Sequence, residues 1–185
     1  MMQAYYDTGA LVPLYVKEAF TDAIVNYVES RNEVIPLNLF QQLELENALR
    51  LKIFRGEMED ERCQAVLKKI KSNLEEGKLA LRPVDWMLAM EAARQLAAQT
   101  TGRWGCRTLD LLHVAVAMQW QCAAFVTADD RQFQAARAAG LKTVDVRTLE
   151  RRDRPDNAES GTPAGAVKEK RVRYGKRKSQ LPVGT

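Results

Sequence analysis

The stretch YYDTGALVPLY, residues 5–15, raises the first question about how this chain folds. Its two tyrosines and the residues before them favour a short buried strand over residues 3–6. A helix is predicted near residues 10–18, and Pro13 would start or kink it. Asp7 stands between the two elements. An aspartate in this place is either a helix cap, a role that this residue type favours, or a ligand, because open α/β sheets put their chemistry at the carboxyl ends of their strands.

Strand-like and helical segments alternate through the rest of the chain. Short runs of β-forming residues predict further strands at residues 33–37, 79–84, 123–127 and 142–146. Apolar residues at three-to-four spacing predict helices at residues 21–31, 39–55, 59–76, 85–100, 107–120 and 131–139. Gly140 is placed to end the last of these helices. This alternation is typical of an α/β fold with three layers, in which helices flank a mostly parallel sheet.

Charge divides the chain into a body and a tail. Residues 151–185 contain 10 Lys and Arg against 4 acids, a net charge of +6; the total of 28 against 24 leaves residues 1–150 with 18 against 20, a net charge of −2. We expect one domain over residues 1–150 and a disordered basic tail over residues 151–185, which is polar and poor in large apolar residues. Its segment RVRYGKRK could contact phosphates and stack Tyr174 on a base, although a plain solvated tail is the favoured interpretation.

Composition argues against several classes of protein. The three cysteines are odd in number and form no CxxC pair, which disfavours a disulfide framework and a thiolate zinc site and favours a reducing cytoplasm. No apolar run is long enough for a membrane span, and no secretory signal is expected. Because His113 is the only histidine, mechanisms that need two imidazoles in one chain are excluded. No Walker A loop, G-x-G-x-x-G or G-x-S-x-G motif is present.

Some acidic residues stand in places that need an explanation. Glu44 and Glu46 lie in a helix with an apolar face, and both could be ordinary surface acids. Asp110 is the only acid of CRTLDLLHVAVAMQW, a helix expected to be largely buried. A buried charge must be paired or coordinated, so an intrahelical partner such as Arg107 or His113 is the simplest explanation. We interpret His113 as a hydrogen-bonded packing residue.

The strand predicted over residues 123–127 repeats the opening arrangement. It ends at Thr127, and Asp129 and Asp130 come before the next helix, which one of them could cap. Two strand-end acids and two helix acids together make a ligand set without histidine or cysteine. Such hard oxygen ligands suit Mg²⁺ or Mn²⁺ rather than zinc, and these ions activate water and stabilise charge in phosphodiester cleavage. The pattern therefore favours a metal-dependent nuclease.

Four segments, YYDTGALVPLY, ELENAL, RTLDLLHVA and FVTAD, together resemble the PIN domain, in particular the VapC-type ribonuclease toxins of toxin–antitoxin pairs. The resemblance spans about residues 3–147, and its motifs are specific only as an ordered set. It implies a parallel sheet flanked by helices, with acids that converge at one end of the sheet. The implied ligands of Mg²⁺ or Mn²⁺ are Asp7, Glu44, Asp110 and Asp129, with Asp130 as a substitute for Asp129 and with Thr8 and Thr127 in support.

The resemblance also implies an activity and partners. It implies a cytoplasmic endoribonuclease, inhibited by a cognate antitoxin protein and assembled as a homodimer. In the toxins it resembles, the region between Gly56 and Gly77 commonly helps to grip the antitoxin, whereas the tail after Glu150 lies outside the family's core. Three alternatives remain: a PIN-like RNA- or protein-binding module with an inactive site, a HAD-like phosphatase, and a receiver-like phosphoacceptor domain. A HAD-like enzyme would have D-x-D where this chain has Gly9, and a receiver would need an acid pair and a lysine that are not evident.

Overall fold

Short strands and longer helices alternate along the chain, and the computed structural model describes residues 3–149. The strands are β1 (Ala4–Tyr6), β2 (Ile35–Leu37), β3 (Leu79–Leu81), β4 (Ala124–Thr127) and β5 (Thr143–Asp145). The helices are α1 (Thr8–Leu11), the 3₁₀ helix η1 (Val12–Leu14), α2 (Thr21–Arg31), α3 (Leu39–Phe54), α4 (Asp60–Glu75), α5 (Trp86–Trp104), α6 (Thr108–Gln119), α7 (Asp130–Ala138) and α8 (Val146–Leu149).

Every strand pairing within residues 3–149 is parallel. Strand β4 lies between β1 and β5, with Tyr6 opposite Val126, while β2 pairs with β3. Parallel neighbours run in the same direction, so their carboxyl ends meet at one edge of the sheet. Asp7, directly after β1, and Thr127, the last residue of β4, are therefore brought to the same edge.

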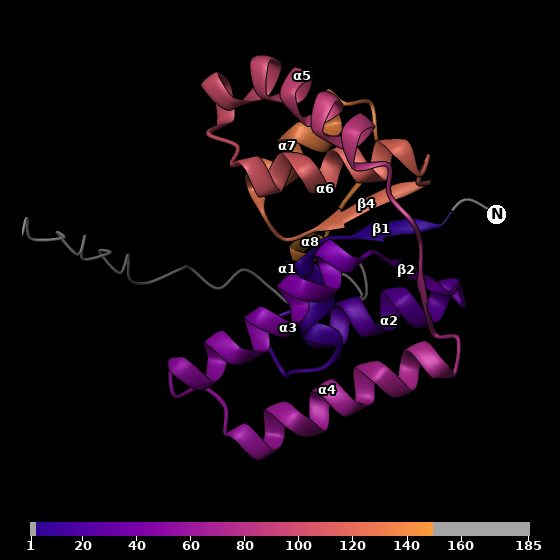
Figure 1. The fold of residues 1–185 in the computed structure, drawn as a ribbon, viewed down its shortest axis with the longest axis vertical. Helices are drawn as coiled ribbons and strands as arrows, with labels where there is room; N and C mark the ends of the chain where they lie inside the picture. The colour runs from indigo at the N-terminus through magenta and orange to yellow at the C-terminus, as the bar shows by residue number, and fades with distance from the viewer. Residues whose placement is uncertain (1–2, 150–185) are drawn as a thin grey trace, which may run out of the picture. The chain divides into compact units, whose positions relative to one another are not determined.

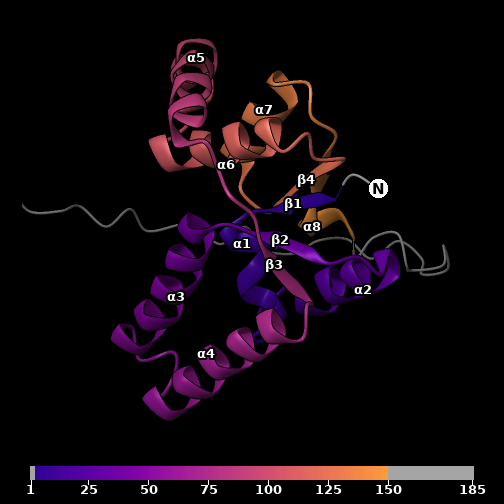
Figure 2. The ribbon, with the colours of Figure 1, turned by 45° about the vertical axis from the view of Figure 1, so that its right-hand side comes forward.

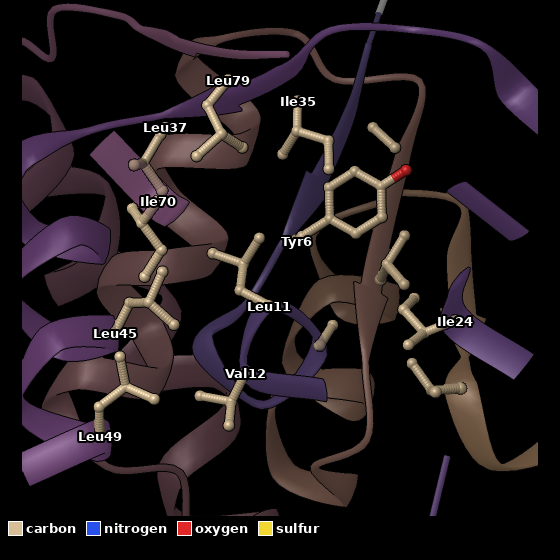
Figure 3. Close-up of a cluster of buried hydrophobic side chains, with 14 of the residues drawn as sticks. Tyr6, Leu11, Val12, Ile24, Ile35, Leu37, Leu45, Leu49, Ile70 and Leu79 are labelled. Carbon is tan, nitrogen blue, oxygen red and sulfur yellow. The ribbon is translucent and has the colours of Figure 1, made fainter. Parts of the chain in front are cut away.

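Helices cover the strands on both faces (Figure 1). Tyr6 and Val126 point into a hydrophobic cluster with residues of α1, α2, α3 and α4, and Figure 3 shows Tyr6 among Leu11, Ile24 and their neighbours. Tyr5 and Phe125 point the opposite way, into a cluster with residues of α5, α6 and α7. This alternation follows from the two-residue period of a strand. Figure 2, from another side, shows the same two groups of helices on either side of β1 and β4.

Helix α6 is buried along most of its length, and this decides where its polar residues lie. All of residues 110–117 are buried, Asp110 and His113 among them. The sequence of this helix is nearly apolar, so it packs between the sheet and the helices α5 and α7 instead of lying on the surface. The helix thereby carries one acid and the only histidine into the interior.

The predicted α/β class, with a parallel sheet flanked by helices, is confirmed. The first helix is shorter than expected, because α1 gives way at Val12 to the 3₁₀ turn that contains Pro13. The strand predicted to end at residue 146 stops at Asp145, since Val146 begins α8, a short helix that the sequence patterns did not predict. The predicted tail over residues 151–185 lies outside the described residues. Among residues 3–149, no helix has the length and apolarity needed to cross a bilayer.

Candidate functional site

The carboxylate of Asp7 lies inside the protein at the end of β1, and only 1% of this residue is exposed. Its Oδ1 atom accepts a 2.7 Å hydrogen bond from the backbone N–H of Ala10, which makes Asp7 the N-cap of α1. Its Oδ2 atom accepts a 2.6 Å hydrogen bond from the hydroxyl of Thr127. The cap role that the sequence offered for Asp7 is confirmed. The same geometry fixes the acid at the carboxyl edge of the sheet.

The charge of this buried carboxylate has no direct counter-ion: among the ion pairs of residues 3–149, none includes Asp7. Burial raises the pKa of Asp7 to about 6, against the lowering effects of the Thr127 hydrogen bond and the His113 charge. The nearby charge of Asp129 adds to the increase. Because an ionised carboxylate is costly to bury unpaired, a positive ligand beside Asp7 would be strongly favourable.

Thr127 links Asp7 to the second strand-end acid. Its hydroxyl oxygen donates to Asp7 and accepts a 2.9 Å hydrogen bond from the backbone N–H of Asp129. Asp129 in turn caps α7, because its Oδ1 atom accepts from the N–H groups of Arg131 at 2.7 Å and Gln132 at 3.2 Å. Burial alone would raise the pKa of Asp129, but the Arg131 side chain and these two N–H groups hold it below its ordinary value.

Asp110 lies close to Asp129 because both approach the same guanidinium. The Nη2 atom of Arg131 is 2.7 Å from Oδ2 of Asp129, and its Nε atom is 3.7 Å from Oδ2 of Asp110. Asp110 also accepts a 2.8 Å hydrogen bond from the backbone N–H of Arg107. The cation beside Asp110 is thus Arg131 on the neighbouring helix α7. Neither intrahelical partner that the spacing suggested, the Arg107 side chain or His113, supplies it.

Glu44 reaches the same edge from α3. Its Oε2 atom accepts a 2.6 Å hydrogen bond from the hydroxyl of Thr8 and lies 2.6 Å from Nε2 of His113. The other imidazole nitrogen, Nδ1, is 2.9 Å from the hydroxyl of Tyr5, so the buried His113 joins β1 to α3. Burial alone would raise the pKa of Glu44, but the hydrogen bonds from His113 and Thr8 and the charge of His113 hold it below its ordinary value.

Buried polar side chains surround these acids. Gln41 donates a 2.7 Å hydrogen bond to the carbonyl of Tyr6, directly before Asp7, and forms a capping box with Asn38 at the start of α3. The Nε2 atom of Gln132 lies 3.5 Å from Asp110, while its buried Oε1 atom has no partner within residues 3–149. Apart from Thr100, the buried polar residues that the structure describes all belong to this edge: Asp7, Asn38, Gln41, Asp110, His113, Thr127 and Gln132.

Hydrogen bonds and ion pairs connect Asp7, Asp129 and Asp110 through Thr127 and Arg131, while Glu44 contacts Thr8, the residue next to Asp7. The two acids that neighbour these ligands in the sequence have other contacts. Asp130 is exposed and pairs with Arg147 of α8, and Glu46 pairs at 3.3 Å with Arg50 on its own helix. Sequence reasoning missed Arg131, Gln132, Asn38 and Gln41 as parts of the site. Asn38 followed by Gln41 is a capping-box signature that could have been found, whereas the arginine and Gln132 carry no local signal of their contacts.

The PIN resemblance implies a divalent cation at this edge, and the ligand atoms present there determine whether such an ion would fit. Within residues 3–149, no three acids, histidines or cysteines form a ready-made metal cage. The donor chemistry does fit, because the oxygens are hard carboxylate ligands and because, in the described part of the chain, Asp7 has no ion-pair partner and the buried Gln132 amide oxygen has no hydrogen-bond partner. Mg²⁺ commonly takes only one or two carboxylates and keeps several waters. The set thus suits a hydrated cation.

The raised pKa of Asp7 predicts how stability depends on pH. The folded state binds this proton more tightly than the unfolded state, so the cost of the ionised carboxylate appears as the pH rises from about 4 to above 6. In EDTA at pH 7.5, Asp7→Asn should therefore raise the free energy of unfolding by about 1–3 kcal/mol, and by little at pH 4. Asn still caps α1.

Chemical denaturation at both pH values measures this difference, with the exposed Asp22→Asn, on α2, as the matched control. A gain of equal size at pH 4 and pH 7.5, or none at either, would contradict the assignment of an unpaired buried charge to Asp7.

Comparison with known proteins supports the fold. Protein-family models and curated proteins give no match to the chain. The solved structure of PAE2754 from Pyrobaculum aerophilum is similar, with 20% identity, a TM-score of 0.54, and coverage of 82% of this chain and 94% of that one. FitAcB from Neisseria gonorrhoeae is similar with 14% identity, a TM-score of 0.57, and coverage of 78% and 98%. At these identities the likeness concerns the fold alone, and it supports the PIN-like arrangement of a parallel sheet flanked by helices.

Proposed function

We propose that the chain is a divalent-metal-dependent endoribonuclease, of the kind that acts as the toxin of a toxin–antitoxin pair. The proposal rests on the buried carboxylate of Asp7, which has no ion-pair partner within residues 3–149 and is hydrogen-bonded through Thr127 toward Asp129 at the carboxyl edge of parallel strands. An ionised acid is costly to bury without a partner, and acids that gather at the carboxyl ends of strands suit a bound cation. Glu44 and Asp110 complete the acidic set.

The chain's own residues would hold and orient this chemistry. Asp7, Glu44, Asp110 and Asp129 would hold Mg²⁺ or Mn²⁺, which when bound supplies activation of water and stabilisation of charge on the phosphate oxygens. Thr127 fixes the orientation of Asp7 by donating to Oδ2, and Ala10 does the same at Oδ1. Supporting hydrogen bonds of this kind preorganise the ligands, which is how a second layer of residues tunes a metal site.

Glu44 is oriented from two sides. Thr8 and His113 both donate to its Oε2 atom, and the hydroxyl of Tyr5 satisfies the other nitrogen of the imidazole. His113 is therefore a positioning residue in this proposal, consistent with its burial. With Nε2 at Glu44 and Nδ1 at the hydroxyl of Tyr5, each ring nitrogen of His113 has one polar partner.

A hollow beside the acids could receive the backbone of a substrate. It has a volume of about 320 Å³, and its polar lining consists of Thr8, Glu18, Lys52 of α3 and Arg55, the residue that follows α3. Lys52 pairs with Glu18 and Glu57, and Arg55 is exposed. Cationic side chains next to an acidic, cation-binding edge suit the phosphates of a nucleic acid.

The nuclease is tested with purified protein and a defined single-stranded RNA, in Mg²⁺ or Mn²⁺ and then in EDTA, with DNA of the same sequence alongside. We expect cutting of RNA that stops in EDTA. Asp7→Asn and Asp110→Asn should each reduce the rate by at least about 100-fold, the scale of losing one preorganised charge-stabilising group. Fragment lengths on a sequencing gel measure both rate and cleavage position.

Glu46→Gln is the matched control for Glu44→Gln on the same helix, because Glu46 pairs with Arg50 and not with a residue of the proposed site. The Glu46→Gln variant should cut at the wild-type rate. RNA that is bound but stays intact would instead favour the PIN-like binding module with an inactive site. If the protein neither cuts nor binds RNA, the resemblance would remain an analogy of fold.

We further propose that an antitoxin protein and a second copy of the chain are its partners. Large apolar side chains stand exposed on two helices: Leu39, Leu43 and Phe54 on α3, at 69%, 67% and 87%, and Met87, Leu88 and Met90 on α5, at 82%, 63% and 52%. Exposed apolar surface of this extent is typical of protein contacts. A native mass of twice 20.9 kDa for the purified chain is the expected result, and a monomer at micromolar concentration would contradict the homodimer.

A further inference from the structure

The side chain of Arg131 contacts the acidic edge, the name used here for the four proposed metal ligands Asp7, Glu44, Asp110 and Asp129. Its guanidinium forms two hydrogen bonds with Asp129, Nη2 to Oδ2 at 2.7 Å and Nε to Oδ1 at 3.3 Å. The same Nε atom lies 3.7 Å from Oδ2 of Asp110. The side chain is 32% exposed, against 29% for Asp129 and 11% for Asp110. One cation thus covers oxygens of two of the four proposed metal ligands.

The helix does not explain this placement. Arg131 is in the first turn of α7, where the helix dipole disfavours a positive charge. Asp129 already caps the helix through the backbone N–H groups of Arg131 and Gln132, so the guanidinium is not needed for the cap. The bidentate approach is instead the geometry in which arginine recognises a carboxylate. The position of the Arg131 guanidinium is therefore explained by its contacts with Asp129 and Asp110 and not by its place in α7.

The distribution of positive charge over the edge is also uneven. Arg131 covers Asp110 and Asp129, and His113 lies against Glu44. Within residues 3–149, the carboxylate of Asp7 has only uncharged hydrogen-bond donors, the N–H of Ala10 and the hydroxyl of Thr127. A divalent cation that binds Asp7 together with Asp110 or Asp129 would meet the guanidinium on the same oxygens. Two positive groups cannot share those oxygens without strong repulsion.

We propose that Arg131 is a built-in counter-ion of the acidic edge, which pairs with Asp110 and Asp129 in the metal-free protein and must leave them when a divalent cation binds. This inference rests on the proposed function, because it takes these acids as metal ligands. It makes the guanidinium a competitor of the cation: the pairing stabilises the metal-free fold and weakens metal binding. The protein would then be stable without metal and would load its site only at sufficient concentrations of the ion.

Calorimetric titration of the full chain with Mn²⁺ alone, without RNA, tests this exchange. Arg131→Gln should bind Mn²⁺ about five- to tenfold more tightly than the wild type, the scale of losing one partly exposed ion-pair network. In EDTA its thermal midpoint should be lower than that of the wild type, and the rise on adding Mn²⁺ should be larger. A merely structural role would lower the midpoint but would leave the affinity for Mn²⁺ unchanged.

Arg137→Gln is the matched control, because it removes the same charge from the same helix while Arg137 contacts the ring of Phe133. It should bind Mn²⁺ like the wild type. Arg131→Lys keeps the charge but loses the two-pronged geometry, so its affinity should lie between those of the wild type and Arg131→Gln. This variant carries the test if the glutamine variant does not fold.

Two outcomes overturn the proposal and are distinguishable from one another. If Arg131→Gln and the wild type bind Mn²⁺ equally, or the variant binds more weakly, the guanidinium does not compete with the cation, while the proposed metal site stands. If neither protein binds Mn²⁺ at millimolar concentrations, the metal site itself is absent, and the proposed function fails together with this inference.

Discussion

The hydrogen bond from the Thr127 hydroxyl to Oδ2 of Asp7, 2.6 Å long and buried, joins the ends of two neighbouring parallel strands. It holds an ionisable carboxylate where water cannot solvate it. Burial there raises the pKa of Asp7 to about 6, which means that folding pays a penalty for its charge at neutral pH. A residue that only stabilised the fold would not need a buried carboxylate, because its charge lowers the stability of the folded state at neutral pH. The rest of the edge is organised around this one costly group.

The neighbouring acids Glu44 and Asp129 differ from Asp7 in the side chains that contact them. Glu44 lies against His113 and Asp129 lies against Arg131, and in both cases the partner helps to hold the pKa of the acid below its ordinary value. Of the four acids, Asp7 is the one that has no ion-pair partner within residues 3–149. This is a common trade between stability and function, in which a site keeps an unfavourable group because a ligand will stabilise it. A divalent cation has the charge and the preference for oxygen that the site lacks.

Much of this could be predicted from the sequence, because the signals were local. The strand-end positions of Asp7 and Asp129 followed from short β-rich runs that stop before a helix. The burial of Asp110 followed from the apolar residues around it. Contacts that join distant segments carry no such signal: His113 meets Glu44 across 69 positions of the chain, and Arg131 meets Asp110 across 21. Nothing in the local sequence indicated a role for Arg131, because the helix dipole disfavours a cation in the first turn of a helix.

We propose that Asp7 and its neighbouring acids bind a divalent cation. The decisive measurement is a crystal structure of the protein soaked in Mn²⁺, with an anomalous difference map collected at the manganese edge. We expect one strong peak at coordination distance from an Asp7 oxygen and from at least one of Glu44, Asp110 and Asp129. A map without a peak at this edge at saturating Mn²⁺, with the Arg131–Asp129 and His113–Glu44 pairs intact, would contradict the claim.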